Sequence, residues 1–258
     1  MGLLDGKIAW ITGAGTGIGR AGAVALAREG AHVVLSGRTR QTLDETADQV
    51  QAAGGRCGIE LLDVADKAAV KRVADGVLAA HGKIDILVNS AGINLRQRTW
   101  GQVAAEGWDD IVRVNLDGTF YCCHAVLPSM RARRDGLVIN VSSWFGKYIM
   151  GLAGPGYTAS KFGVAALTET INVEDGPNGI RACVLCPGEA ATPIMERRPV
   201  KPPADQLERM LQEEDLGRTI LFVASLPARV CINEIIISPT HNRFYVGGLE
   251  AAAPSTNS

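Results

Sequence analysis

The sequence predicts a doubly wound α/β fold, in which a seven-stranded parallel sheet carries helices on both faces within a single domain. Two observations support this class. A chain of 258 residues, 47% of them apolar, is long enough to bury one substantial core and is typical of a single domain. Short apolar or β-branched runs also alternate with segments of helical period, as in parallel strands joined by right-handed crossover helices.

Seven runs of residues supply the expected strands. Each is short and almost continuously apolar, as parallel strands covered on both faces require. The runs are IAWIT at 8–12, HVVLS at 32–36, GIELLDV at 58–64, IDILVNS at 84–90, LVINVSS at 137–143, IRACVLC at 180–186 and EIIIS at 234–238. Helices are expected between them. The one after the second strand places Leu43, Ala47 and Val50 on one face and ends at a pair of glycines.

We expect residues 1–250 to form this one domain, since no internal repeat or linker divides the sequence. The segment at 192–206 contains four prolines and interrupts the alternation, so a mobile substrate flap is predicted over about 192–215. The last residues, 251–258, are small and polar, and we expect them to form a flexible tail.

The overall charge excludes some classes of partner. Lys and Arg number 26 against 27 Asp and Glu, so no positive excess favours nucleic acid or an anionic membrane. The first residues lack the basic region of a signal peptide, and no run approaches the roughly 20 apolar residues of a membrane span. We therefore expect a cytoplasmic protein whose partner is a small molecule, with no nucleic-acid or membrane partner.

The six cysteines and four histidines indicate neither a disulfide framework nor a metal site. Cys183 and Cys186 form a C-x-x-C pair, but they lie in an expected strand, where an odd separation directs two side chains to opposite faces. The histidines are scattered without the spacing of metal ligands. We expect free, buried thiols and no metal.

A glycine-rich turn follows the first expected strand. Gly13, Gly17 and Gly19 stand between that strand and a helix that runs to Gly30. Glycines at a strand-to-helix turn allow the backbone to approach a pyrophosphate at the positive end of the helix, although the same residues also serve ordinary turns. Open parallel sheets bind such ligands at the carboxyl ends of their strands, so a dinucleotide cofactor is predicted there.

The residues that follow the second and third strands bear on which dinucleotide binds. An acidic residue after the second strand would hydrogen-bond the adenosine ribose of NAD, but the chain has Gly37 there. Arg38 follows and can pair with a 2′-phosphate, which favours NADP(H) over NAD(H), although an arginine at a strand end is also commonly solvated. Asp63, which closes the third expected strand, can accept from the adenine amino group or simply stabilise the start of the next helix.

The stretch YTASK at 157–161 predicts the chemistry. On a helix, Tyr157 and Lys161 lie four residues apart, about 6 Å along one face. Tyrosine normally titrates at about pH 10. Acid–base catalysis near neutrality therefore needs a pKa lowered by roughly three units, which corresponds to about 4 kcal/mol of preferential stabilisation of the anion. We expect the lysine ammonium and an oxidised nicotinamide to supply this. Tyr157 would then transfer the hydroxyl proton while hydride moves to or from the cofactor.

Two serines, Ser142 and Ser143, end the fifth expected strand on the same rim of the sheet. Ser143 would donate a hydrogen bond to the substrate carbonyl oxygen and stabilise its developing charge. Ser142 is the less suitable donor, because alternation turns its side chain the other way.

Several motifs occur in order over about residues 5–240. They are TGAGTGIG, NSAG at 89–92, VNLDGTF at 114–120, SSWFG, YTASK and PGEAAT at 187–192. This set closely resembles the short-chain dehydrogenase/reductase superfamily. The resemblance implies a Rossmann-type sheet and a homo-oligomer, a tetramer or dimer built through the helices that carry the Asn and Tyr motifs.

The resemblance also implies an active tetrad of Asn115, Ser143, Tyr157 and Lys161. In that arrangement Lys161 also holds the nicotinamide ribose, and Asn115 anchors a water-linked proton relay. Ser143 stands 14 residues before Tyr157, one more than the commonest spacing in the family, so we expect the intervening loop to bulge and shape the substrate pocket. The DGG motif frequent near the C-terminus of family members is absent.

Further residues are expected at the cofactor. The resemblance implies that Asn89 stabilises the central strands and that Thr192 and the Pro187–Gly188 backbone meet the nicotinamide amide. The full set of expected cofactor-binding residues is Gly13, Thr16, Gly17, Ile18, Gly19, Arg38, Asp63, Val64, Asn89, Ala91, Gly92, Tyr157, Lys161, Pro187, Gly188 and Thr192.

Two sets of side chains bear on the substrate. Apolar residues after the serines would suit a hydrophobic ketone, namely Trp144, Phe145, Ile149 and Met150. Cations beyond the fourth strand and in the flap would suit a carboxylate or phosphate, namely Arg96, Arg98, Arg197, Arg198 and Lys201. We expect the apolar residues to pack on the core instead and the flap cations to be solvated.

The sequence therefore predicts an NAD(P)(H)-dependent oxidoreductase that interconverts a ketone or aldehyde and a secondary alcohol. A catalytically inactive NAD(P)-binding sensor or scaffold is the alternative, because fold alone does not establish chemistry, but the intact Ser, Tyr and Lys argue against it. A nucleotide-sugar epimerase or dehydratase is a third hypothesis. It is disfavoured because the sequence lacks the extra C-terminal substrate domain expected of such enzymes.

Overall fold

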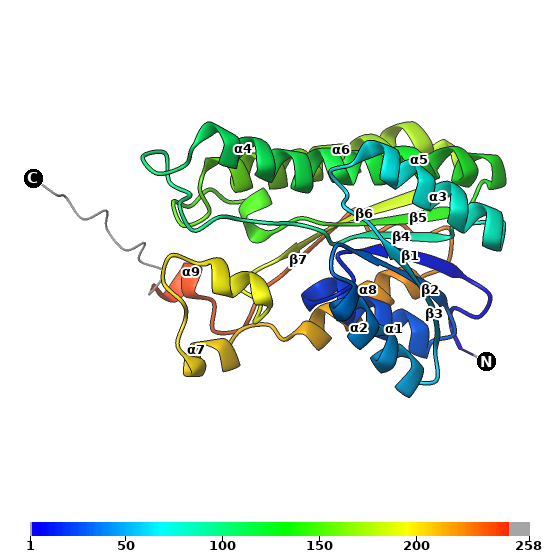
Figure 1. Ribbon diagram of the computed structural model, residues 1–258, viewed down its shortest axis with the longest axis horizontal. Helices are drawn as coiled ribbons and strands as arrows, with labels where there is room; N and C mark the ends of the chain where they lie inside the picture. The colour runs from blue at the N-terminus through cyan, green and yellow to red at the C-terminus, as the bar shows by residue number, and fades with distance from the viewer. Residues whose placement is uncertain (1, 248–258) are drawn as a thin grey trace, which may run out of the picture.

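The computed structural model describes residues 2–247, which form one seven-stranded sheet with helices on both faces (Figure 1). The strand order is β3-β2-β1-β4-β5-β6-β7, and all neighbouring strands are parallel. The strands are β1 (Ile8–Thr12), β2 (His32–Gly37), β3 (Arg56–Leu61), β4 (Ile86–Asn89), β5 (Gly136–Val141), β6 (Ile180–Pro187) and β7 (Glu234–Ile237). The predicted doubly wound fold is confirmed.

Helices form a layer on each face of the sheet (Figure 1). One layer contains α1 (Gly17–Arg28), α2 (Arg40–Ala52) and α8 (Glu213–Ser225). The other contains α3 (Lys67–His81), α4 (Ala105–Val112), α5 (Gly118–Arg133) and α6 (Pro155–Asp175). A π-helical turn, Arg113–Asp117, joins α4 to α5, and 3-10 turns occupy Trp144–Gly146, Gly176–Asn178 and Pro193–Arg197. Two short helices, α7 (Ala204–Glu208) and α9 (Arg243–Val246), lie at the same end of the molecule.

Each layer buries its own apolar core against the sheet. Alternation along β1 shows the division, because Ala9 and Ile11 face α1, α2 and α8, whereas Ile8 and Trp10 face α3 and α5. The predicted apolar face of α2 is confirmed, since Leu43 is fully buried in the first of these cores. The strands are therefore covered on both sides, as their continuous apolar sequences predict.

The third strand is shorter than its sequence predicts. It ends at Leu61, which pairs with Gly37 at the end of β2. Because β3 lies at the edge of the sheet and pairs only with β2, the end of β2 limits the ladder. Asp63, expected to close this strand, lies in the turn that follows, where its Oδ1 accepts from the backbone N–H of Ala65 at 3.0 Å.

The carboxyl ends of the strands meet at one edge of the sheet. β1 and β4 are neighbours there although β2 and β3 lie between them in sequence. The chain leaves these two strands in opposite directions across the sheet, and such a reversal opens a crevice in which open α/β sheets bind ligands.

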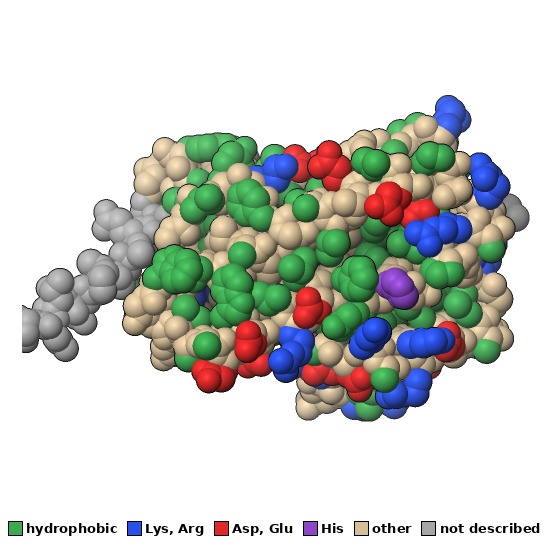
Figure 2. Space-filling model, turned by 90° about the horizontal axis from the view of Figure 1, so that it is seen from above, with side chains coloured by type: hydrophobic (Ala, Val, Ile, Leu, Met, Phe, Trp, Pro, Cys, Tyr) green, Lys and Arg blue, Asp and Glu red, His purple; other side chains and the backbone are tan. Residues whose placement is uncertain are grey.

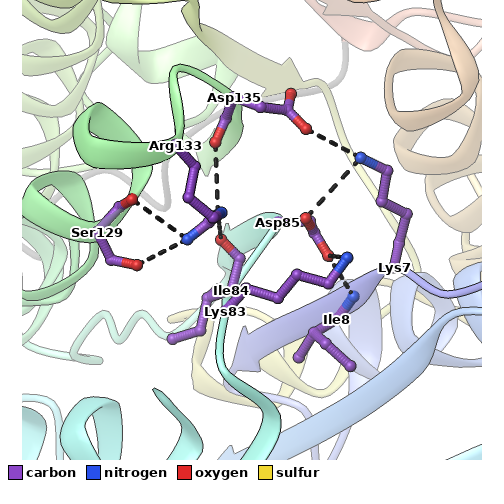
Figure 3. Close-up of polar contacts among 8 residues, drawn as sticks. All are labelled: Lys7, Ile8, Lys83, Ile84, Asp85, Ser129, Arg133 and Asp135. Atoms are coloured by element: carbon purple, nitrogen blue, oxygen red, sulfur yellow. Dashed lines mark hydrogen bonds and ion pairs between the residues drawn. The ribbon is translucent and has the colours of Figure 1, made fainter.

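The opposite edge is held by a polar network (Figure 3). Asp85 is 5% exposed, and its Oδ2 accepts from the backbone N–H of Ile8 at 2.8 Å and pairs with Lys83 at 3.0 Å. Lys7 lies between Asp85 Oδ1, at 3.8 Å, and Asp135 Oδ2, at 3.0 Å. The network therefore links the beginnings of β1, β4 and β5, far from the crevice.

Within residues 2–247, no helix is long and apolar enough to cross a membrane, and no cluster of three or more potential metal ligands occurs. All six cysteines are free thiols. Cys183 and Cys186 are buried as expected, whereas Cys231 is exposed. The predicted tail at 251–258 lies outside the described residues.

Candidate active site

A cavity of about 360 Å³ lies at the carboxyl ends of β1, β4, β5 and β6. It brings together residues from most of the predicted motifs. Those that border it are Gly13, Thr16, Gly17, Ile18, Arg38, Ala91, Gly92, Ser143, Tyr157, Lys161, Pro187, Gly188 and Thr192. Five other expected site residues, Gly19, Asp63, Val64, Asn89 and Asn115, are not among the residues that border it.

The glycine turn after β1 has no room for side chains. A Cβ on Gly13 would lie 2.8 Å from the backbone of Ala91, and one on Gly19 would overlap the carbonyl oxygen of Gly13. Gly13 and Gly17 also have positive φ angles, of 64° and 57°. Gly19 therefore acts by allowing α1 to approach the turn rather than by bordering the cavity.

The amino end of α1 is open toward the cavity. Thr16 precedes the helix, is exposed and makes no side-chain capping hydrogen bond. The first backbone N–H groups of a helix have no intrahelical partners, and they carry partial positive charge. Gly17 lies next to Thr192 at the border of the cavity, because a Cβ on Gly17 would lie 3.5 Å from the Thr192 Cβ. The Gly17 N–H hydrogen-bonds Glu213, and the remaining N–H groups of the first turn, together with the absent side chains, form a cradle that fits a dinucleotide pyrophosphate.

The residues expected around the adenosine separate into two groups. Arg38 is exposed directly after β2 and borders the cavity. Asp63 and Val64 do not border it. Val64 is 6% exposed and packs where α5 begins, since a Cβ on Gly118 would lie 2.7 Å from Val64 Cγ2.

Asn89 lies inside the sheet rather than at the cavity. Its Nδ2 donates to Asn140 Oδ1 at 2.9 Å and to the Cys123 sulfur at 3.4 Å, which joins β4 to β5 and α5. The next residues turn out of the strand, and the backbone N–H of Ala91 donates to Thr12 Oγ1 at 3.3 Å. The geometry fits the structural role implied for Asn89.

Tyr157 and Lys161 lie in the first half of α6, with the Lys161 Nζ 5.6 Å from the centroid of the tyrosine ring. Lys161 is 5% exposed and donates from Nζ to the carbonyl oxygen of Val141 at 2.8 Å. Pro155 at the start of α6 fixes the beginning of the helix. The predicted placement of both side chains on one helix beside the crevice is confirmed.

Burial and nearby charges set the electrostatics of the pair. Burial raises the pKa of Tyr157, while a hydrogen bond with Ser143 and the charges of Arg98 and Arg198 act to lower it. Burial lowers the pKa of Lys161 to about 8. The lowering expected from Lys161 together with an oxidised nicotinamide stays a prediction for the cofactor-bound protein. In this structure the lysine is itself desolvated and bonded to a backbone carbonyl, and the cations that act to lower the pKa of the phenol are the two arginines.

The two serines after β5 have different surroundings. Ser143 precedes the 3-10 turn, its Oγ accepts from the backbone N–H of Phe145 at 3.2 Å, and it hydrogen-bonds Tyr157. Ser142 donates from Oγ to the carbonyl oxygen of Lys161 at 2.8 Å. The hydroxyl of Ser142 is thus bonded to α6, and that of Ser143 is directed to the phenol.

Asn115 is fully buried in the π-helical turn. Its Oδ1 accepts from the backbone N–H of Ile93 at 2.8 Å, and its Nδ2 donates to the carbonyl oxygen of Ile93 at 3.0 Å and to Ser160 Oγ at 3.2 Å. Asn115 therefore fixes the loop after β4 against α6. The same side chain lies close to Lys161, because a Cβ on Gly92 would be 3.4 Å from Asn115 Oδ1 and 3.5 Å from Lys161 Nζ.

Sequence reasoning missed a buried charge cluster at the cavity. Arg198, in the predicted flap, is 9% exposed and pairs with Glu189 Oε1 at 2.5 Å, so the expectation that it is solvated is wrong. Arg243 of α9 pairs with the same carboxylate, at 2.5 Å to Oε1 and 2.6 Å to Oε2. Burial acts to raise the pKa of Glu189, but Arg243 and Arg198 hold it below its ordinary value. The 54-residue separation of Glu189 and Arg243 gives no local sequence signal.

An aromatic wall closes another side of the cavity. Phe244 of α9 stacks on Trp144, with ring centroids 5.1 Å apart and 10° between planes, and meets Phe145 at 5.4 Å. Phe145 in turn lies edge-on to Tyr157 at 6.3 Å. The long loop after Ser143 therefore shapes the cavity as expected. Trp144 and Phe145 border the cavity, whereas Ile149 is 81% exposed rather than packed on the core.

The family model for short chain dehydrogenases matches residues 7–202. The chain belongs to the short-chain dehydrogenase/reductase family of NAD(P)-dependent oxidoreductases. Its sequence is 34% identical over 241 residues to the 3-oxoacyl-(acyl-carrier-protein) reductase of Thermotoga maritima, a match that covers 90% of this chain and 96% of that protein.

Two solved structures agree with this assignment. A metagenomic short-chain oxidoreductase in complex with NADP has a TM-score of 0.81 and 31% identity, and the match covers 92% of this chain and 99% of that one. The alcohol dehydrogenase from the archaeon Thermococcus sibiricus, complexed with 5-hydroxy-NADP, has a TM-score of 0.82 and 28% identity, covering 92% and 98%.

Proposed function

We propose that this protein is an NADP(H)-dependent carbonyl reductase or alcohol dehydrogenase that interconverts a ketone and a secondary alcohol. The observation that carries the proposal is the common cavity. Ser143, Tyr157 and Lys161 border the same space as the open amino end of α1, so a proton donor and a dinucleotide site adjoin. The family assignment supports the same class of reaction.

The side chains suit proton transfer at a carbonyl oxygen. When bound, the nicotinamide supplies or accepts the hydride. Burial keeps the Tyr157 hydroxyl protonated, so in the reductive direction it donates this proton to the carbonyl oxygen. Ser143 donates a hydrogen bond to the same oxygen as negative charge develops on it. In the oxidative direction, Tyr157 takes the proton back, and the charges of Arg98 and Arg198 stabilise its anion.

We infer that the proton of Tyr157 is resupplied through Lys161 and Asn115. Lys161 Nζ and Asn115 Oδ1 both lie close to Gly92, which borders the cavity. Lys161, whose pKa of about 8 allows exchange of a proton near neutral pH, is the group next to the phenol. We assign Lys161 the second role of holding the nicotinamide ribose, and we assign Asn115 that of anchoring the water-linked relay.

NADP(H) is the cofactor we favour, with NAD(H) as the alternative. Arg38 borders the cavity. At the position where an NAD-binding protein would have an acidic residue, this chain has Gly37. A guanidinium suits a 2′-phosphate, because it forms charge-assisted, bidentate hydrogen bonds. The two structural relatives described above contain NADP or a derivative of it.

We also propose a homo-oligomer that forms through the face of α4, α5 and α6. Figure 2 shows this face, with hydrophobic side chains along its middle and charged ones toward its borders. Phe120 of α5 is 46% exposed, and Phe162 and Val173 of α6 are 38% and 72% exposed. Contiguous exposed apolar surface is typical of protein interfaces. The cytoplasm is the compartment we propose, because six unpaired cysteines are typical of a reducing compartment.

Replacement of Tyr157 by Phe tests the function directly. We expect kcat for reduction of a responsive ketone to fall about 1,000-fold, because the proton donor is lost, while the Kd for NADPH changes by less than about twofold. The assay follows nicotinamide absorbance over a panel of ketones and secondary alcohols, with NADPH affinity from fluorescence titration. Tyr121→Phe on α5, outside the cavity lining, is the control.

Two outcomes would contradict the proposal in different ways. Activity of the Tyr157→Phe variant within about tenfold of the unaltered protein would reject Tyr157 as the proton donor. An unaltered protein that binds NADPH but turns over no member of the panel would favour the sensor or scaffold alternative.

A further inference from the structure

Two arginines reach the cavity from different parts of the chain. Arg98 lies in the loop after β4 and is 6% exposed, and Arg198 lies after β6 and is 9% exposed. Both border the cavity with Tyr157 and are close enough to act on the pKa of its phenol. Burial and the charge of Arg198 lower the pKa of Arg98 to about 10, which shows that the two guanidinium groups also act on each other.

The described residues do not neutralise these two charges fully. Arg198 pairs with Glu189, whereas no carboxylate among residues 2–247 forms an ion pair with Arg98. Arg98 donates from Nη2 to the carbonyl oxygen of Arg197, which is neutral. Its Nε is buried without a hydrogen-bond partner among residues 2–247. Buried charge or an unpaired donor of this kind is costly unless a partner compensates it.

We propose that Arg98 and Arg198 bind a carboxylate of the substrate, so that the enzyme acts on a small keto acid and the corresponding hydroxy acid. The planar guanidinium fork matches a carboxylate in geometry and charge. The proposal rests on the proposed function, because it adds a binding group next to the carbonyl that Tyr157 protonates. The carboxylate takes no part in the bond changes, which remain the gain of hydride at the carbonyl carbon and of a proton at its oxygen.

Arg98 is held in a fixed position relative to Tyr157. Asn94, in the same loop, donates from Nδ2 to the carbonyl oxygen of Ala153 at 3.1 Å. A Cβ on Gly154 would overlap the carbonyl oxygen of Arg98, so the two backbones touch immediately before α6 begins. Arg198 is fixed by Glu189, which follows β6 closely. Groups held in this way lose little entropy on binding, which favours recognition.

The rest of the cavity limits the size of such a substrate. Phe145 and Phe244 form an apolar wall beside Tyr157, and the same cavity also has to accept the nicotinamide end of the cofactor. We therefore infer that only a short chain separates the carbonyl from the carboxylate of the substrate.

A purely structural role for the arginines predicts different behaviour. Arg96 donates from Nη2 to the carbonyl oxygen of Glu196 at 3.1 Å, much as Arg98 donates to Arg197, but Arg96 is exposed and is not among the residues that border the cavity. If Arg98, like Arg96, only fastens the loop after β4 to the segment after β6, its loss should affect charged and neutral substrates alike. Arg96 therefore provides a matched control.

The test measures kcat/KM for keto acids and for their methyl esters. The panel contains 2-oxobutanoate, 3-oxobutanoate and 4-oxopentanoate, each with its ester, and dihydroxyacetone phosphate. For at least one acid we expect kcat/KM to exceed that of its ester by about 100-fold, as hydrogen bonds to a charged group imply. Arg98→Met should remove most of this preference by raising KM for the acid, whereas any effect through the Tyr157 phenol should change kcat for acid and ester equally. Arg96→Met should retain the preference.

A second readout does not need turnover. In the presence of saturating NADP⁺, calorimetry should detect binding of butanoate but not of the neutral butanamide, and Arg98→Met should abolish the butanoate signal. Failure of the unaltered protein to bind butanoate would overturn the proposal.

The outcomes separate this proposal from the proposed function. Good turnover of esters with no preference for acids would overturn the carboxylate site and leave the oxidoreductase function intact. Preference for dihydroxyacetone phosphate over every acid would overturn the assignment of a carboxylate. Cofactor binding without turnover of any compound would contradict the proposed function, whereas the calorimetric result would still decide whether the arginines bind a carboxylate.

Discussion

Lys161 is a buried cation beside the phenol, and its protonation state is set by its surroundings. Burial lowers its pKa to about 8, so the ammonium form predominates below that pH and is lost as the pH rises through it. The cysteines of the interior ionise later, with the pKa of Cys186 at about 11 and those of Cys123 and Cys183 at about 12. Lys161 is therefore the interior group with a shifted pKa expected to change charge in the weakly alkaline range.

This titration predicts a pH dependence of cofactor binding. If the Lys161 ammonium holds the nicotinamide ribose, the Kd for NADPH should rise about tenfold between about pH 7 and about pH 9.5, since the positive charge disappears over that interval. Fluorescence titration at several pH values measures this. Lys161→Met should bind NADPH weakly and with no such pH dependence, and an identical profile in both proteins would contradict the role.

Arg38 offers a second prediction at the scale of a residue. Arg38→Ala should lower the ratio of kcat/KM for NADPH to that for NADH by about 100-fold, because a charge-assisted contact with the 2′-phosphate is lost, while the value for NADH stays nearly constant. Arg40→Ala is the control, since Arg40 is exposed two residues later and pairs with Asp44 at 2.9 Å. A preference for NADH in the unaltered protein would show that Arg38 is a bystander.

At the scale of elements, the proposed association of copies of the chain depends on α5 and α6. The exposed face of these helices carries Phe120, whose ring contacts that of His124 at 5.6 Å, and Phe162. Phe120→Asp should shift the protein to a smaller assembly, because an interface cannot bury an unpaired carboxylate cheaply. Sedimentation velocity at micromolar concentration measures the mass.

The control for this prediction lies on the other layer of helices. Phe222 of α8 is 53% exposed, so Phe222→Asp introduces the same charge away from the proposed interface and should leave the assembly unchanged. A monomeric unaltered protein, or an unchanged mass for the α5 variant, would reject the interface.

The buried face of a helix could be predicted from the local sequence pattern. The end of a strand could be predicted less well, because it depends on pairing with a neighbouring strand. Leu43 and Val50 set the buried face of α2, and the sequence shows this directly. The end of β3 depends instead on its pairing with Gly37 of another strand, which a run of apolar letters does not reveal. Asp63 was placed at the end of the strand for this reason, and the structure puts it in the turn beyond.

For the whole molecule, the doubly wound parallel sheet and the common position of Tyr157, Lys161 and the glycine turn could be predicted from the sequence. The buried charge cluster did not, because a cation in a proline-rich segment is ordinarily exposed, and Arg198 becomes buried only when Glu189 and Arg243 meet in the fold. Phe244 was missed for the same reason: it reaches Trp144 across 100 positions of sequence.

The contribution of α9 to the cavity wall has a practical consequence for handling this protein. Phe244 is near the carboxyl end of the chain, whereas the amino end lies on the far side of the molecule (Figure 1). A purification tag at the amino terminus lies away from this aromatic stack, so we expect it to leave the kinetics undisturbed. For the same reason, libraries aimed at new specificity can vary the final helix and spare the sheet.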